Sequence, residues 1–198
     1  MLINRIKGQN LSLFVKEWDA FDYKKNKVNY LKKSKIGNIN NLGKPSCSEA
    51  QLFTKNDSCF VDSIEPKVKE LVLVIINNLN YITFSSCEGH PEYFDKDEQI
   101  LVNFRERQVS ILPRNENEHQ KILKTFNEIV KTTNNMFIND HIYINLTEEI
   151  LEEITDDYRK EWISISIIFT SKSDDFKKYF GELEKIYKIF LKNFKLVS

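Results

Sequence analysis

The segment Ser85-Ser86-Cys87-Glu88-Gly89-His90 places hydroxyl, thiol, carboxylate and imidazole groups within six consecutive residues. Hydroxyls and backbone N–H groups in such a turn can bind a carboxylate or phosphate oxygen. Glu88 can accept from an ammonium or hydroxyl group, and the imidazole of His90 titrates near neutral pH and can transfer a proton. Gly89 permits unusual backbone angles and lets a ligand approach the main chain. We therefore predict a ligand-binding loop, with Ser85, Ser86, Glu88 and Gly89 as binding residues and Cys87 and His90 as catalytic residues.

Cys87 and His90 allow three interpretations, two with a chemical role and one that is only structural. In the first, His90 activates the thiol of Cys87 as the nucleophile of a small-molecule hydrolase or transferase. In the second, they form half of a tetrahedral zinc site that Cys47 and Cys59 complete, but eleven residues separate those two cysteines, where two to four are usual. A zinc site is therefore not expected, and no metal ligand is assigned. In the plain interpretation, the segment is a polar turn with a buried, unreactive thiol.

A helix followed by a strand is predicted to carry this loop. Asp62 or Ser63 can cap the helix, and Pro66 falls in its first turn, where a missing N–H costs nothing. Apolar residues then recur at helical spacing, and several asparagines end the helix before residue 81. The following stretch, Tyr81–Ser85, is rich in β-forming residues and leads directly into the loop.

The rest of the chain alternates short strands with two long helices. Strands are predicted at residues 100–104, 108–112, 142–146 and 162–170, and helices at 116–133 and 174–194. The first two strands are expected to form a hairpin that turns at 105–107, and the acid-rich stretch 148–158 is ambiguous. Because strands follow one another without an intervening helix, the fold class is α+β. We expect a mixed or antiparallel sheet packed by three main helices.

Residues 1–57 are predicted to form an N-terminal helix and an irregular arm that precede a single α+β domain at residues 58–198. Phe14, Val15 and Trp18 belong to the apolar set of the helix, which is expected within residues 11–31. Residues 32–57 are polar and contain several Gly, Asn and Pro residues that interrupt regular structure.

The composition is that of a folded, electrically balanced protein. A hydrophobic fraction of 41% supports a packed core rather than disorder, and the 29 basic and 29 acidic residues give a net charge of zero, which requires no nucleic-acid partner. No signal peptide is visible, and the longest apolar run, Leu71–Ile76, is far shorter than the roughly 20 residues that cross a bilayer. Three cysteines make no disulfide framework. We expect a cytoplasmic protein with reduced thiols and no membrane segment.

The stretch of roughly residues 57–90 resembles the family of the third wybutosine-synthesis protein, which are S-adenosylmethionine-dependent methyltransferases acting on a modified guanosine next to a tRNA anticodon. The resemblance rests on an acidic residue at a helix start, an Ile-Asn pair near the helix end and a strand of the form Tyr-x-Thr-x-Ser-Ser-Cys-x-Gly, here Asp62, Ile76, Asn77, Tyr81, Thr83, Ser85, Ser86, Cys87 and Gly89. The chain departs from the family at Glu88, where the family has Ser, and at His90, where it has Arg. Losing the Arg removes a permanently charged fork suited to a carboxylate or phosphate, so a changed ligand is expected.

The resemblance implies a transferase in tRNA processing that moves a methyl group from S-adenosylmethionine to a base, with tRNA or a nucleotide as the partner. It implies that Ser85, Ser86, Cys87 and Gly89 form the floor of the pocket, and that Asp62 is an acid/base or ligand-anchoring residue. Phosphates would then be held by Arg105, Arg107 and Arg114, with Arg105 as the ligand-binding candidate.

A non-enzymatic binding or assembly protein is the alternative from a different class. The C-terminal helix carries a stripe of Phe and Tyr residues that could dock on a partner protein, and the arm at 32–57 could wrap around one. Such a stripe is more often core than interface. The sequence thus leaves open whether the chain is an enzyme.

Overall fold

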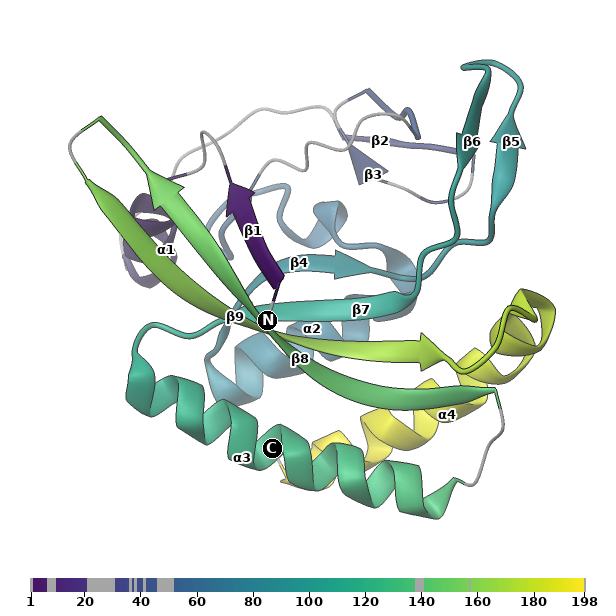
Figure 1. Ribbon diagram of the computed structural model, residues 1–198. Coiled ribbons are helices and arrows are strands. Elements are labelled where there is room, and N and C mark those ends of the chain that lie inside the picture. Colours follow the sequence, from purple (N-terminus) through teal and green to yellow (C-terminus); the bar gives the residue numbers. More distant parts are fainter. Residues whose placement is uncertain are drawn as a thin grey trace.

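A five-stranded sheet with the order β1-β8-β9-β7-β4 forms the centre of the computed structural model (Figure 1). The structure describes residues 2–6, 10–20, 31–35, 37, 39–40, 42–45, 52–137, 141–156 and 158–197. The strands are β1 (Leu2–Ile6), β4 (Ile82–Cys87), β7 (Arg107–Leu112), β8 (Ile142–Ile154) and β9 (Arg159–Ser171). Only the β1–β8 pair in this sheet is parallel. The predicted α+β class with a mixed sheet is confirmed.

Three helices pack against this sheet, namely α2 (Pro66–Leu79), α3 (Glu116–Met136) and α4 (Phe176–Val197). Figure 1 shows α3 and α4 running beneath the sheet. Each helix buries one apolar stripe, and in α4 the buried set includes Leu183, Ile186, Tyr187, Phe190 and Phe194. The aromatic stripe of α4 is therefore core, which leaves that stripe unavailable for a partner protein.

The helix ahead of the loop begins and ends for local reasons. Pro66 stands at its first position, as predicted, but the residue at the N-cap is Glu65 and not Asp62 or Ser63. Those two residues lie one turn earlier, in a short 3-10 helix, η1 (Val61–Ser63). At the other end, Asn80 adopts the left-handed conformation, with φ of 56°, and its N–H bonds back to the carbonyls of the last turn.

The predicted hairpin of residues 100–112 is wrong. Strand β6 (Ile100–Val102) pairs with β5 (Tyr93–Asp95), whereas β7 pairs with β4 and β9. The Asp95 carboxylate closes the β5–β6 turn by accepting hydrogen bonds at 2.9 Å from two backbone N–H groups of that turn. Because residues 95–98 stabilise this turn locally, β6 pairs with β5 and not with β7.

The acid-rich stretch that the sequence left ambiguous continues β8 as far as Ile154. Strands β8 and β9 pair over their whole length, from Ile142 opposite Ser171 to Ile154 opposite Arg159. Burial of acidic side chains within a strand requires partners. Glu152 forms an ion pair with Arg159, and Glu153 accepts hydrogen bonds from several donors.

The N-terminal region contributes to the same core. Helix α1 spans Leu11–Asp19, so it ends well before the predicted limit at residue 31, and residues 21–30 lie outside the described part of the chain. The described part of the predicted arm includes two-residue strands, β2 (Lys32–Lys33) and β3 (Ile39–Asn40), which pair with each other. Leu11, Phe14 and Trp18 of α1 are buried in the main hydrophobic cluster. In the described residues, no helix is both long and apolar enough to span a membrane.

Candidate functional site

The loop after β4 depends on Gly89 for its shape. Gly89 has a φ of +86°, and a Cβ atom there would lie 3.2 Å from the backbone nitrogen of Arg107. On its C-terminal side, His90 and Arg105 exchange two backbone hydrogen bonds of 2.9 and 2.8 Å. The unusual backbone angle predicted at Gly89 is confirmed, and the closeness of β7 gives a second reason for glycine at this position.

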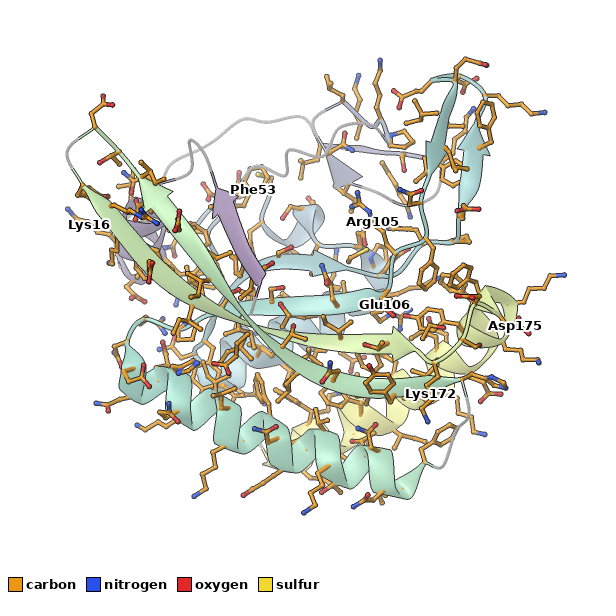
Figure 2. The ribbon with its side chains drawn as sticks, in the orientation of Figure 1. Lys16, Phe53, Arg105, Glu106, Lys172 and Asp175 are labelled. Carbon is orange, nitrogen blue, oxygen red and sulfur yellow. The ribbon has the colours of Figure 1, made fainter. Side chains whose placement is uncertain are left out.

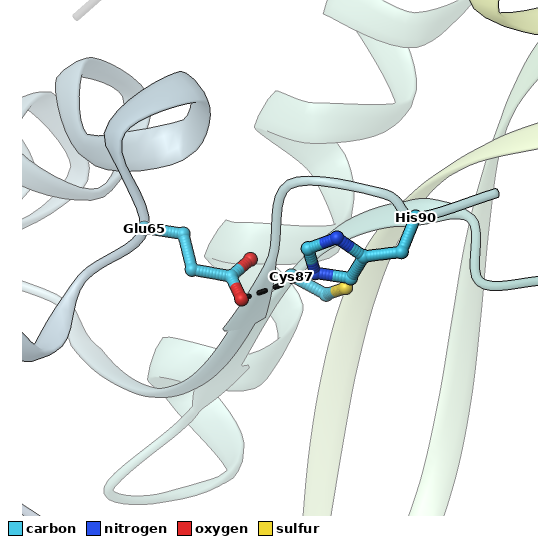
Figure 3. A group of neighbouring side chains, drawn as sticks. All are labelled: Glu65, Cys87 and His90. Atoms are coloured by element: carbon cyan, nitrogen blue, oxygen red, sulfur yellow. Dashed lines mark hydrogen bonds and ion pairs between the residues drawn. The ribbon is translucent and has the colours of Figure 1, made fainter. Parts of the chain in front are cut away.

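A carboxylate, a thiol and an imidazole lie close together beside this loop, as Figure 3 shows. His90 Nε2 lies 3.1 Å from Glu65 Oε1, and one donor atom from each of Glu65, Cys87 and His90 lies within 4.8 Å of the others. All three side chains are buried, and His90 is only 1% exposed. We call Glu65, Cys87 and His90 the buried cluster.

The electrostatics of the buried cluster favour a charged imidazole. Burial by itself lowers the pKa of His90, but hydrogen bonds to Cys87 and Glu65, together with the negative charge of Glu65, outweigh that effect and raise the pKa to about 10. His90 therefore carries a proton at neutral pH and does not act there as a free general base.

Sequence reasoning missed Glu65, which lies 25 positions before its partner His90. Its position at the start of α2, immediately before Pro66, points to a helix cap, yet its side chain makes no capping bond. The carboxylate instead accepts a 2.5 Å hydrogen bond from the backbone N–H of Glu88. In return, Glu88 Oε2 accepts from the backbone N–H of Lys67, at 3.0 Å. The two glutamates thus join the start of α2 to the end of β4.

Glu88 is therefore an internal residue and not an exposed ligand-binding group. It is 7% exposed, and Gly37 of the N-terminal region packs against it so closely that a Cβ at that glycine would lie 2.9 Å from Glu88 Oε1. Gly37, which lies between β2 and β3, thus covers part of the loop. The predicted binding role of Glu88 is not supported by this burial.

Arg107, which was expected to hold a phosphate, has a structural role instead. The Arg107 side chain is fully buried, its Nε donates to the carbonyl of Glu88 at 2.9 Å, and its Nη2 lies 2.5 Å from the carboxylate of Glu184 on α4. Its guanidinium also stacks over the ring of Tyr187. The phosphate role of Arg107 is therefore wrong, because the side chain fastens the loop to α4 from inside.

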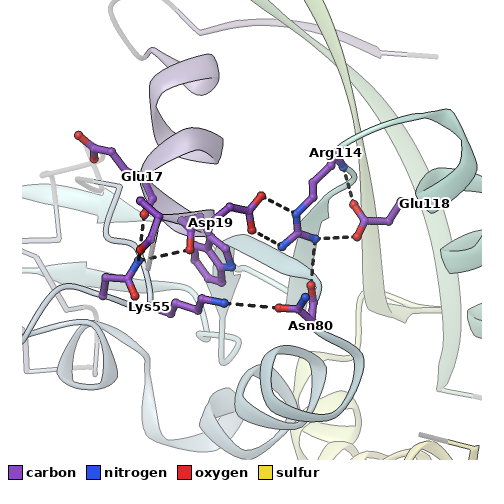
Figure 4. A network of polar contacts seen from close by, with 9 residues as sticks. Glu17, Asp19, Lys55, Asn80, Arg114 and Glu118 are labelled. Atoms are coloured by element: carbon purple, nitrogen blue, oxygen red, sulfur yellow. Dashed lines mark hydrogen bonds and ion pairs between the residues drawn. The ribbon is translucent and has the colours of Figure 1, made fainter. Parts of the chain in front are cut away.

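The side chains of the other two arginines are less buried than that of Arg107. Arg114 forms a two-bond ion pair with Asp19 and also donates to Glu118 and to the carbonyl of Asn80, so its guanidinium links α1, α2 and α3 (Figure 4). Arg105 is exposed, and Figure 2 shows it near the base of the β5–β6 hairpin. Of the three, Arg105 keeps a guanidinium that solvent can reach.

A cavity of about 110 Å³ lies beside the start of the loop, where Ser85 and Ser86 form part of its wall. Its wall combines hydroxyl groups, one carboxylate and aromatic rings, and includes Glu65, Phe53, Phe60, Phe84, Ser85 and Ser86. Cys87 and His90 are not among its lining residues. The predicted site therefore divides into two parts, a cavity that contains the serines and a buried cluster that contains the thiol and the imidazole. Glu65 belongs to both.

Asp62, the predicted acid/base residue, belongs neither to the cavity wall nor to the buried cluster. It is exposed on η1 and does not line the cavity, although its neighbour Ser63 does. The helix–strand unit thus brings η1 to the cavity, but it does not place the Asp62 carboxylate in the buried cluster.

No family model, curated protein or solved structure matches this chain.

Proposed function

We propose that this protein is an enzyme that binds S-adenosylmethionine or a nucleotide in the cavity beside β4 and acts on a nucleic-acid base. One observation carries the proposal. Ser85 and Ser86 line a cavity together with three phenylalanine rings, and neither serine hydroxyl has a hydrogen-bond partner within the described residues.

The lining chemistry suits a heteroaromatic ring. Phe53, Phe60 and Phe84 offer ring surfaces on which a base can stack, and such stacking tolerates different bases. The serine hydroxyls can donate to or accept from the edge of the base or a ribose. The ring faces favour a ligand with positive charge, which is a property of the sulfonium of S-adenosylmethionine.

The size of the cavity limits what it can hold without a change of shape. Pockets for drug-sized ligands measure roughly 300–1,000 Å³, whereas this one measures about 110 Å³. It accommodates one ring or a short chain, so a complete cofactor requires one wall to move outward. Leu31, Ile39 and Asn40 form a wall from the β2–β3 region, and we propose that this wall shifts on binding.

Methyl transfer requires that the donor carbon and the accepting base nitrogen be held in contact and that one proton leave the base. In this proposal the cavity supplies the first requirement by orienting the stacked ring. Asp62 does not line the cavity, but it is exposed next to the lining residue Ser63, so we propose its carboxylate as the acceptor of that proton. Arg105, which solvent can reach, is the candidate contact for a phosphate.

The cavity gives less support to the other candidate functions. A nucleophilic thiol has to reach its substrate, but Cys87 is 8% exposed and does not line the cavity. A partner-binding role for α4 is weakened because its aromatic stripe is buried.

Calorimetry with S-adenosylmethionine, S-adenosylhomocysteine and guanosine monophosphate tests the proposal. The Phe84→Ala variant is expected to bind the active ligand more weakly by about 1–3 kcal/mol, the usual value of one base–aromatic stack. Phe94→Ala is the matched control, because Phe94 is 53% exposed on β5 and does not line the cavity. Absence of heat and of a thermal shift with every ligand at millimolar concentration would refute the proposal.

A further inference from the structure

We propose that Glu65, Cys87 and His90 bind one zinc ion. This inference goes beyond the proposed function and does not depend on it. It rests on the convergence of a carboxylate oxygen, a thiol sulfur and an imidazole nitrogen on one small, buried volume.

The distances suit one tetrahedral ion. Zinc bonds to sulfur at about 2.3 Å and to nitrogen and oxygen at about 2.0 Å, so ligand atoms around one ion lie roughly 3.3–3.6 Å apart. The Glu65 oxygen and the His90 nitrogen are 3.1 Å apart, and all three donor atoms lie within 4.8 Å of one another. Zinc binding therefore requires the three donors to draw closer together than they lie here.

The donor types also suit zinc. Zinc binding releases one proton from the Cys87 thiol and one from the His90 imidazolium to solvent. The resulting thiolate and neutral imidazole favour a borderline-soft ion, and a carboxylate completes the mixed set found in protein zinc sites. Hard ions such as Mg²⁺ and Ca²⁺ prefer oxygen ligands alone. Three protein ligands leave one position of the tetrahedron for water or another small group.

The protein holds these donors in place through a second layer of contacts. The second oxygen of Glu65 accepts from the Glu88 N–H, the Glu88 carbonyl accepts from Arg107, and His90 is fixed by its backbone bonds to Arg105. Such contacts orient metal ligands and are a regular part of metal sites. A simple ion pair between Glu65 and His90 does not require the thiol to point at the same spot.

The proposed site differs from the zinc arrangement that the sequence offered. Cys87 and His90 keep the two-residue spacing of a zinc half-site, but the proposed third ligand is Glu65 and not Cys47 or Cys59. Cys47 lies outside the described residues, and Cys59 is not a member of the cluster. Glu65 also lines the cavity, so the ion would sit at the cavity wall and fasten the start of α2 to the end of β4.

The test uses the full chain, stripped with a chelator and then titrated with zinc or with cobalt in the absence of any nucleotide. We expect about one ion per chain, a rise in Tm with zinc, and the charge-transfer absorption of a thiolate–cobalt bond. Cys87→Ser and Glu65→Gln, which preserve shape, are expected to weaken zinc binding by more than about 100-fold, beyond the usual effect of losing an outer-layer contact.

Cys59→Ser is the matched control, since it removes a thiol outside the cluster, and it should bind zinc as the wild type does. If the stripped wild type takes up no zinc, or if Cys87→Ser and Glu65→Gln bind it as tightly as Cys59→Ser, the zinc site does not exist. Should a ligand variant fail to fold, the cobalt spectrum of the wild type still decides, because a spectrum without thiolate charge transfer contradicts the proposal. None of these readouts involves S-adenosylmethionine, so failure here is distinct from failure of the proposed function.

Discussion

Two glycines of this chain stand in opposite environments, and the difference explains why only one of them shapes the site. Gly89 adopts a positive φ and has backbone atoms of Arg105 and Arg107 within 3.4 Å of where a Cβ would lie. Gly181 lies within helix α4, and a Cβ there would meet nothing within 4 Å. The same mutation at the two positions should therefore have opposite effects on stability.

We predict that Gly89→Ala lowers the free energy of unfolding by about 1–3 kcal/mol, because the alanine is strained at this φ. Gly181→Ala, in contrast, should raise it by roughly 0.5–1 kcal/mol, since alanine is the better helix residue. Urea denaturation of both variants beside the wild type measures these changes. Equal effects of the two substitutions would contradict the role assigned to Gly89.

At the scale of elements, one buried carboxylate joins α1 to the β8–β9 hairpin. Glu153 of β8 accepts hydrogen bonds from the backbone N–H and hydroxyl of Ser12, the indole of Trp162 and the hydroxyl of Tyr158. Burial raises the pKa of Glu153, but these donors together outweigh burial and hold the pKa below its usual value of 4.5. The ionised form of Glu153 is therefore the form that anchors α1.

A group whose pKa is lower in the folded state stabilises the fold above its unfolded pKa and loses that effect as the pH falls through the folded value. We predict that Glu153→Gln is less stable than the wild type at neutral pH, and that this difference shrinks as the pH falls below about 4.5. Urea denaturation across this range measures the difference, and hydrogen exchange should show α1 opening first in the variant. The control is Glu161→Gln, an exposed carboxylate on β9, whose effect should be small at every pH.

At the scale of the whole molecule, the first and last parts of the chain share one core. Trp18 of α1 is 1% exposed and packs edge-on against Phe14 and Phe60. Strand β1 pairs with β8, far along the chain. Because these contacts join distant segments, we expect the N-terminal region to unfold together with the sheet.

We predict that Trp18→Ala destabilises the entire fold by about 3–5 kcal/mol, the usual cost of removing a large buried aromatic side chain. The chain has two tryptophans, so the fluorescence of this variant comes from Trp162 in the sheet. Its fluorescence transition and its far-UV circular dichroism transition should coincide at a lower Tm than that of the wild type. An unchanged transition of Trp162 would show that the N-terminal helix is not coupled to the sheet.

Features set by near neighbours in the chain were predictable from the sequence. The apolar stripes of α2, α3 and α4, the helix end at Asn80 and the need for glycine at position 89 depend on residues within a few positions. Helical periodicity, capping and backbone strain are local effects, and the α+β class follows from the order of the elements that they define. The two-residue spacing between Cys87 and His90 is likewise visible in the sequence alone.

Only the tertiary structure decided which distant residues meet. It brought Glu65 to His90, buried Arg107 against α4, paired β6 with β5 and β1 with β8, and divided the predicted site into a cavity and a buried cluster. The physical reason is that a buried polar or charged group is stabilised by a partner that the fold places beside it, often from a distant part of the chain. The sequence shows only which groups need such a partner. A carboxylate at a helix start is a cap or an ion ligand depending on what the fold places opposite it.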